Sequence, residues 1–129
     1  MRKLTLVVMP GEYTVARLGS ADSVPDSIWR ASGLVSVTRT TEELSVVAPA
    51  EALARIESER AEPGWRLLTV RGPLAFTLSG IMAALTGELA AAGVPLFALS
   101  TFDTDHLLVK DADLGRAITA LRTAGHEVA

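Results

Sequence analysis

Two stretches of the chain repeat each other at a fixed spacing, and this repeat restricts the possible folds more than any other feature. The segment LVSVTRTTEELSVVAPAE begins at Leu34, and its counterpart LFALSTFDTDHLLVKDAD begins at Leu96. Both have the alternating apolar residues and central polar turn of a β-hairpin. The same spacing places LTLVVM (4–9) over RLLTVR (66–71). A common spacing over three predicted strands favours two modules of the same kind.

The second module has the clearer pattern of elements. Apolar residues at helical spacing predict helices in FTLSGIMAALTGELAAAG (76–93) and in DADLGRAITALRTAG (111–125), where Asp111 suits the N-cap. Strands are predicted at WRLLTVRG, PLFALS, HLLVK and HEV. The resulting order, β-α-β-β-α-β, is that of the ferredoxin-like fold, in which two helices cover one face of a four-stranded sheet.

The first module is predicted to be a degenerate copy. In YTVARLGSADSVPDSIWRASG, residues Tyr13–Leu18 alternate like a strand, and only a turn or a short helix is expected near Pro25. A second helix is expected in PAEALARIESERAEPG, ended by Pro63-Gly64. We therefore predict an α+β fold of two tandem ferredoxin-like modules, a degenerate one at 1–63 and a complete one at 64–129.

Composition excludes several classes of function. The 129 residues are 49% hydrophobic and 21% charged, which is typical of a globular protein. The net charge is −3 and the basic residues are scattered, so nucleic acid is not an expected partner. Without cysteine there are no disulfides or thiolate metal sites, and no apolar run approaches the roughly 20 residues of a membrane span. We expect a soluble, cytoplasmic protein without a membrane partner, metal or cofactor.

The region from Gly72 to Ile81 has features of a carboxylate-binding site. A glycine-bearing turn that opens a helix presents free backbone N–H groups and the positive end of the helix dipole. Without a Cβ, Gly80 would let a ligand approach the backbone closely. The alternative is that Gly80 only lets the helix pack tightly on the sheet.

The stretch STFDTDHLLVK (100–110) is the other candidate. Asp105 is suited to bind an ammonium group, Thr101 offers a hydroxyl, and Phe102 offers an apolar or cation–π wall. These residue types also serve ordinary turns. Asp103 is interpreted as an Asx-turn residue, and the alternative for Phe102 is a place in the core.

In RGPLAFTLSGIMAAL and STFDTDHLLVK the chain resembles the small ACT-domain proteins, which are related to the regulatory domains of aspartate kinases and to animal cytosolic arginine sensors. The resemblance implies an amino-acid ligand held at an interface between ACT modules. It carries over to these ligand-binding candidates: Gly80, Ile81, Thr101, Phe102 and Asp105. The arginine-sensing relatives also have an acid just before the Gly-Ile pair. Here 75–79 reads AFTLS, which argues for a small or neutral ligand over arginine.

The expected function is therefore that of a non-catalytic amino-acid sensor, a homodimer that acts on a regulated partner protein. Two alternatives stay open, a ligand-free structural adaptor and a small ferredoxin-like isomerase. The isomerase is disfavoured because the sequence shows no convergent acid–base set beyond Asp105 and His106. Trp29 and Trp65 are expected to pack between the two modules.

Overall fold

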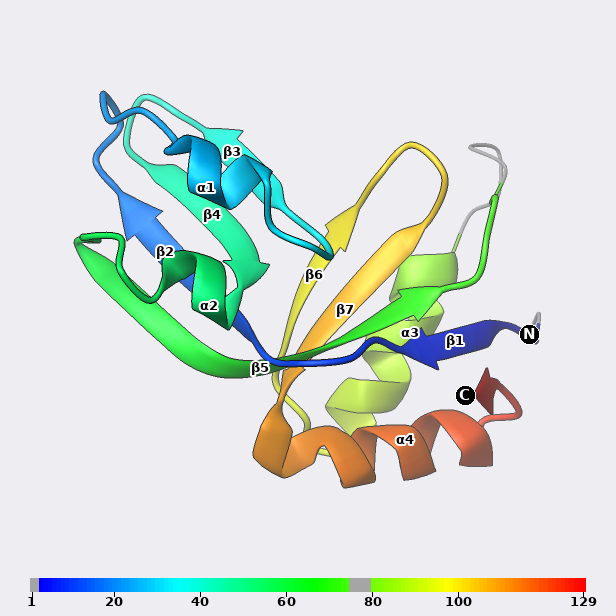
Figure 1. Ribbon diagram of the computed structural model, residues 1–129. Coiled ribbons are helices and arrows are strands. Elements are labelled where there is room, and N and C mark those ends of the chain that lie inside the picture. Colours follow the sequence, from blue (N-terminus) through cyan, green and yellow to red (C-terminus); the bar gives the residue numbers. More distant parts are fainter. Residues whose placement is uncertain (1–2, 75–79) are drawn as a thin grey trace. The chain divides into compact units, whose positions relative to one another are not determined.

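The computed structural model describes residues 3–74 and 80–129 and divides into two compact units (Figure 1). One unit is Gly11–Trp65, and the other combines Met1–Pro10 with Arg66–Ala129. Both contain strands and helices, which confirms the predicted α+β fold. The division differs from the expected 1–63 and 64–129, because the segment Met1–Pro10 belongs to the C-terminal unit.

The unit Gly11–Trp65 has the element order β-α-β-β-α-β. Its elements are β2 (Tyr13–Leu18), α1 (Asp26–Trp29), β3 (Ser36–Arg39), β4 (Leu44–Pro49), α2 (Ala50–Leu53) and the first part of β5 (Arg60–Val70). The strand order β3-β4-β2-β5 is that of a ferredoxin-like sheet. Each helix is only a single turn long, so the helical layer is reduced, as the predicted degeneracy implies.

The predicted boundary at Pro63-Gly64 lies inside β5. Tyr13 pairs with Trp65 and Val15 with Glu62, so Thr14 alone faces two residues of β5. Gly64 has a φ of +82°, and this extra residue forms a β-bulge. Proline is tolerated at a bulge, so the dipeptide that normally ends an element here only bends one. The expected helix before it is limited to a single turn.

The second unit contains the predicted strands and helices of the C-terminal module. They are the rest of β5, α3 (Ile81–Ala91), β6 (Leu96–Ser100), β7 (Asp105–Lys110), a 3₁₀ turn (Asp111–Asp113), α4 (Leu114–Thr123) and β8 (Glu127–Val128). Asp111 starts the 3₁₀ turn instead of capping α4, whose N-cap is Asp113 and receives no side-chain cap. None of the helices in the described ranges is long and apolar enough to cross a membrane.

An additional strand, β1 (Thr5–Val8), completes this second unit. It pairs antiparallel with β5 and parallel with β8, which gives the order β6-β7-β5-β1-β8. The backbone N–H of Leu4 also donates to His126 Nδ1 at 3.1 Å. Leu6 is fully buried in the core, with Leu68 and Val70 of the neighbouring strand. The two strands that the repeat set in equivalent places thus pair with each other in one sheet.

Both predicted hairpins are confirmed, and they match closely. The backbone N–H of Thr40 donates to the Glu43 carbonyl at 2.9 Å, and that of Thr101 donates to the Thr104 carbonyl at 2.8 Å. Turn 40–43 therefore corresponds to turn 101–104, one position out of step with the sequence repeat. This correspondence identifies equivalent positions in the two units.

Candidate functional site

A pocket of about 320 Å³ lies between the start of α3 and the turn of the β6–β7 hairpin. The structure brings together at this pocket all of the predicted ligand-binding residues: Gly80, Ile81, Thr101, Phe102 and Asp105. The other lining residues lie outside that predicted set: Leu74, Met82, Ala83, Ser100, Asp103 and Thr104. The pocket is formed within the C-terminal unit alone.

The hairpin fixes the position of the Asp105 carboxylate. Asp105 begins β7 and lies directly opposite Ser100, the last residue of β6. The Ser100 hydroxyl donates to Asp105 Oδ1 at 2.5 Å. Side chains alternate along β7, and Leu107 and Val109 lie in the core beneath the helices. Asp105 therefore faces the same side of the sheet as α3.

Backbone contacts hold the loop after β5 against the hairpin turn. The Leu74 N–H donates to the Asp103 carbonyl at 2.6 Å, and the Thr104 hydroxyl donates to the Val70 carbonyl at 2.5 Å. A Cβ on Gly72 would lie 2.9 Å from the Asp103 carbonyl oxygen, so this contact requires glycine. Asp103 thus fixes the loop through its carbonyl group, a backbone role that residue type does not reveal.

Gly80 is the N-cap of α3 and has a φ of +78°. Among residues 3–74 and 80–129, a Cβ built on Gly80 would meet nothing within 4 Å, so these residues give the tight-packing alternative no support. The requirement for glycine comes from the left-handed backbone. No side chain of the described residues caps this helix start. A helix start of this kind offers N–H groups and a positive dipole end that suit a carboxylate.

Two glycine substitutions in this helix are expected to have opposite effects. Gly80→Ala should lower the free energy of unfolding by about 1–2 kcal/mol, because alanine is strained at positive φ. Gly87→Ala should raise it by about 0.5–1 kcal/mol, since Gly87 lies inside α3 with open space around it. Urea denaturation of both variants checks this. A stabilised Gly80→Ala would contradict the strained-backbone explanation.

The Thr101 hydroxyl contacts its own turn and His106, whereas the sequence predicted that it would bind the ligand. Its Oγ1 donates to the Thr104 carbonyl at 3.2 Å and lies 3.1 Å from His106 Nε2. The other ring nitrogen of His106 lies 3.0 Å from the Thr69 hydroxyl. His106 therefore lies on the sheet face opposite Asp105, with both ring nitrogens engaged. The two side chains diverge, as expected, and do not form an acid–base pair.

Burial of His106 makes stability depend on pH. Desolvation lowers the pKa of His106 below its ordinary value of about 6.5, and the nearby Asp105 charge opposes this shift only in part. The unfolded chain then binds this proton more readily than the folded chain. The contribution of His106 to the free energy of unfolding is therefore fully present above a pH of about 6.5. It is lost as the pH falls toward the lower pKa of the folded state.

We therefore expect the free energy of unfolding to decrease when pH is lowered from about 7.5 to about 5.5. His106→Gln should remove most of this slope, because glutamine does not titrate. Urea titrations of both proteins at several pH values measure the difference between the two slopes. An unchanged slope in the variant would assign the pH dependence to other groups.

Two aromatic side chains are more exposed than a packing role would require. Phe102 is 78% exposed, so it is not a core residue, and it lines the pocket. Trp29 is 57% exposed, against the expectation that it packs between the modules.

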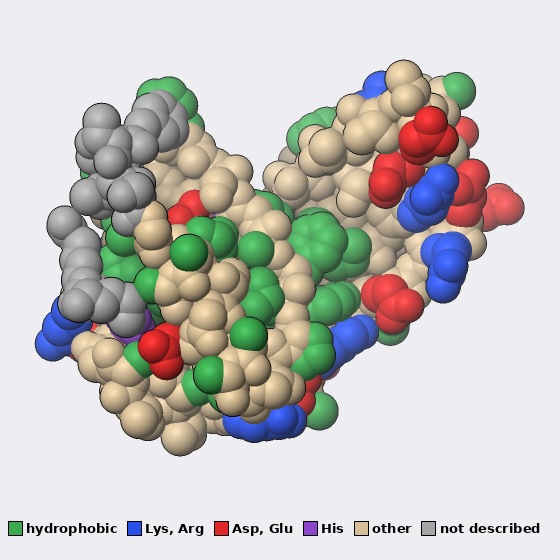
Figure 2. All heavy atoms as spheres, turned by 180° about the vertical axis from the view of Figure 1, so that it is seen from behind, with side chains coloured by type: hydrophobic (Ala, Val, Ile, Leu, Met, Phe, Trp, Pro, Cys, Tyr) green, Lys and Arg blue, Asp and Glu red, His purple; other side chains and the backbone are tan. Residues whose placement is uncertain are grey.

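On the face drawn in Figure 2, acidic and basic side chains are interspersed over the unit Gly11–Trp65. Several hydrophobic side chains reach the surface of the other unit.

Two features limit the chemistry of this site. Among residues 3–74 and 80–129, no three His, Cys, Asp or Glu side chains are grouped so that they could hold a metal ion. The segment 75–79, whose lack of an acid argues against arginine, lies outside the described residues. The expectation about ligand type therefore rests on the sequence of this segment.

The ferredoxin-like unit, with a pocket between its first helix and its hairpin turn, agrees with the class of ACT-domain proteins. Residues 60–123 match the family model described as the ACT domain, so this part of the chain belongs to that family. A second family model, described as an N-terminal domain, matches residues 11–59. The crystal structure of protein Atu0741 from Agobacterium tumefaciens is similar over 100% of this chain and 94% of its own, with 35% identity and a TM-score of 0.90.

Two further matches are to proteins whose names indicate regulation or sensing. The human protein called cytosolic arginine sensor for mTORC1 subunit 1 is 35% identical over 85 residues, and the match covers 61% of this chain and 26% of the relative. The chain thus spans about a quarter of the length of the curated relatives that it matches. The regulatory subunit of aspartate kinase from Thermus flavus has a TM-score of 0.68 over 95% of this chain and 99% of its own. At 12% identity this similarity shows the fold alone.

Proposed function

We propose that this chain is a non-catalytic regulatory protein that binds a free amino acid in the pocket between α3 and the β6–β7 turn. The observation that carries the proposal is the pairing of two opposite binding elements at one pocket. The start of α3, with its N–H groups and positive dipole end, suits a carboxylate, and the Asp105 carboxylate suits an ammonium group. A free amino acid carries both groups on adjacent atoms.

The size and lining of the pocket support a small ligand. Its volume of about 320 Å³ is at the low end of the range for small-molecule sites. The carboxylate of the ligand would lie at the N–H groups after Gly80, and its side chain would lie against Ile81 and Phe102. No acid occurs in 75–79 to bind a distant guanidinium group. We therefore favour a small or neutral amino acid over arginine.

We further propose that the protein is a homodimer joined through β6. In the described part of the chain β6 pairs with β7 alone, so its outer edge is open to a second strand. The strand carries Leu96, Phe97 and Leu99 and has no charged residue, and an edge of this kind favours pairing. A second copy along this edge would bring the pocket, and the exposed Phe102, close to the subunit interface. Ligand binding would then be coupled to dimer geometry and to a regulated partner protein.

The alternatives receive less support. An isomerase would need convergent acid and base groups, whereas Asp105 and His106 lie on opposite faces of the sheet. A ligand-free adaptor would not need a helix start and an acid together at one pocket. The name of the human relative, an arginine sensor, agrees with a regulatory role.

The proposal is tested by measuring the melting temperature of the purified protein with each common amino acid in turn. A ligand present at about 100 times its Kd should stabilise the protein by roughly 2.7 kcal/mol, which is visible as a shift of several degrees. We expect a shift with one or a few small amino acids. Light scattering with and without that ligand gives the oligomeric state. No shift with any amino acid would overturn the proposed ligand class.

A further inference from the structure

The pocket of the C-terminal unit has a counterpart in the unit Gly11–Trp65. Because turn 40–43 corresponds to turn 101–104, Arg39 takes the place of Ser100, and Leu44 takes the place of Asp105. Arg39 lies opposite Leu44 as Ser100 lies opposite Asp105. An open hollow is present at this counterpart, lined by Ser20, Ala21, Arg39, Thr40 and Thr41.

The side chains at the counterpart differ in chemistry from those at the pocket of the C-terminal unit. Leu44 is fully buried in the core of its unit, so no acid faces the hollow from this position. The guanidinium group of Arg39 extends to the loop after β2. Its Nη1 donates to the Ser20 carbonyl, and its Nη2 donates to the Asp22 carbonyl at 2.9 Å.

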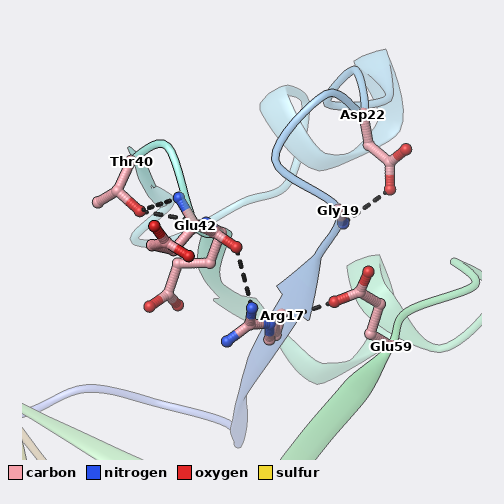
Figure 3. Close-up of polar contacts among 7 residues, drawn as sticks. Arg17, Gly19, Asp22, Thr40, Glu42 and Glu59 are labelled. Atoms are coloured by element: carbon pink, nitrogen blue, oxygen red, sulfur yellow. Dashed lines mark hydrogen bonds and ion pairs between the residues drawn. The ribbon is translucent and has the colours of Figure 1, made fainter.

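The loop that receives this guanidinium group is fixed by its own hydrogen bonds. The Asp22 N–H donates to the Gly19 carbonyl at 2.9 Å, and the Gly19 N–H donates to Asp22 Oδ2 at 2.8 Å. Figure 3 shows the Asp22 carboxylate turned toward the backbone of Gly19. On the other side of the hollow, the Thr40 hydroxyl accepts from the N–H groups of Glu42 and Glu43, both at 3.1 Å. Both walls are therefore held in shape independently of Arg39.

We propose that the carbonyls of Ser20 and Asp22 form a guanidinium-binding site that the chain fills with its own Arg39. The two carbonyl acceptors, one for each terminal nitrogen, match the planar fork of a guanidinium group. An ammonium group has no such fork. The degenerate unit thus carries a permanent occupant at the place that corresponds to the pocket of the C-terminal unit. This inference concerns the unit Gly11–Trp65 and stands independently of the amino-acid proposal.

The test is chemical rescue of Arg39→Ala with methylguanidinium. Removing the guanidinium group should lower the melting temperature by about 3 °C. Methylguanidinium chloride should restore it saturably in Arg39→Ala and leave the wild-type protein unchanged, while sodium chloride at equal concentration restores nothing. Arg39→Lys should behave like Arg39→Ala. Hydrogen exchange at the Gly19 and Asp22 amides should stay close to the wild-type rate in Arg39→Ala, because the hydrogen bonds of the loop itself remain.

Arg55→Ala is the matched control, because it removes an exposed arginine from the same unit at another place. Equal effects of Arg39→Ala and Arg55→Ala would overturn the inference. So would a methylguanidinium effect that is the same in the wild-type and Arg39→Ala proteins, or full retention of stability in Arg39→Lys.

A second measurement separates this inference from the proposed function. If the amino-acid proposal holds, the occupied counterpart sets the stoichiometry at one amino acid per chain, measured by titration calorimetry. Two amino acids per chain would overturn the self-filled site and leave amino-acid binding intact. Rescue by methylguanidinium without any amino-acid binding would support the self-filled site and overturn the proposed function.

Discussion

Asp105→Asn is expected to weaken amino-acid binding by about 30-fold or more, the result of losing a charge-assisted contact with the ligand ammonium group. Asparagine is the informative replacement, since it retains an oxygen that can accept from the Ser100 hydroxyl and so preserves the hairpin contact. The melting-temperature shift caused by the best amino acid should largely disappear. Calorimetric titration of the variant with that amino acid gives the change in Kd.

A matched variant separates the effect of the site from the effect of net charge. Glu88→Gln removes one negative charge from the same unit, near the other end of α3, and should leave the Kd within about twofold of the wild-type value. The melting temperature of Asp105→Asn without ligand should stay close to that of the wild-type protein. Equal losses of affinity in both variants would show that Asp105 acts only through the overall charge.

Leu6→Ala is expected to cost about 2–5 kcal/mol of the free energy of unfolding, as large-to-small changes in a packed core do. Leu6 is fully buried among residues of the C-terminal unit, although the chain returns to that unit only at Arg66. Hydrogen exchange should therefore increase in α3, α4 and β8, and change little in Gly11–Trp65. Urea denaturation gives the magnitude.

Val7→Ala is the control on the same strand, because its side chain points to the other face of the sheet and is only partly buried. It should cost less than half as much as Leu6→Ala. If Leu6→Ala instead lost exchange protection in Gly11–Trp65, with α3 and α4 unaffected, the first strand would belong to the N-terminal module. This result would refute the observed pairing.

Local patterns were sufficient to predict most elements of the fold. Alternation gave β2 at its observed bounds, and the two hairpins followed from β-branched runs around polar turns. The partner of β1 did not follow, because alternation identifies a strand and its buried face but not the strand beside it. Pro63-Gly64 was interpreted as an end because those residues usually stop an element. Only the register of β2 shows that they form a bulge.

The candidate site was predictable to the level of segments. The resemblance named the helix start at Gly80 and the turn before Asp105, and these segments line one pocket. The hydroxyl of Thr101 was not predictable, since its bonds to His106 and to the turn depend on which face of β7 each residue occupies. The contribution of Asp103 was also hidden, because it is made by a carbonyl group that every residue has.

The placement of β1 has a consequence for the order of events during synthesis on the ribosome. The contiguous segment Gly11–Trp65 contains every strand of its own unit, so this unit can be completed as soon as it leaves the exit tunnel. The strand β1 emerges earlier, yet its partners β5 and β8 are translated later, the second of them at Glu127–Val128. An apolar strand therefore leaves the tunnel without a partner, and one of its edges stays open until β8 has been made. During this interval β1 is exposed to pairing with other chains.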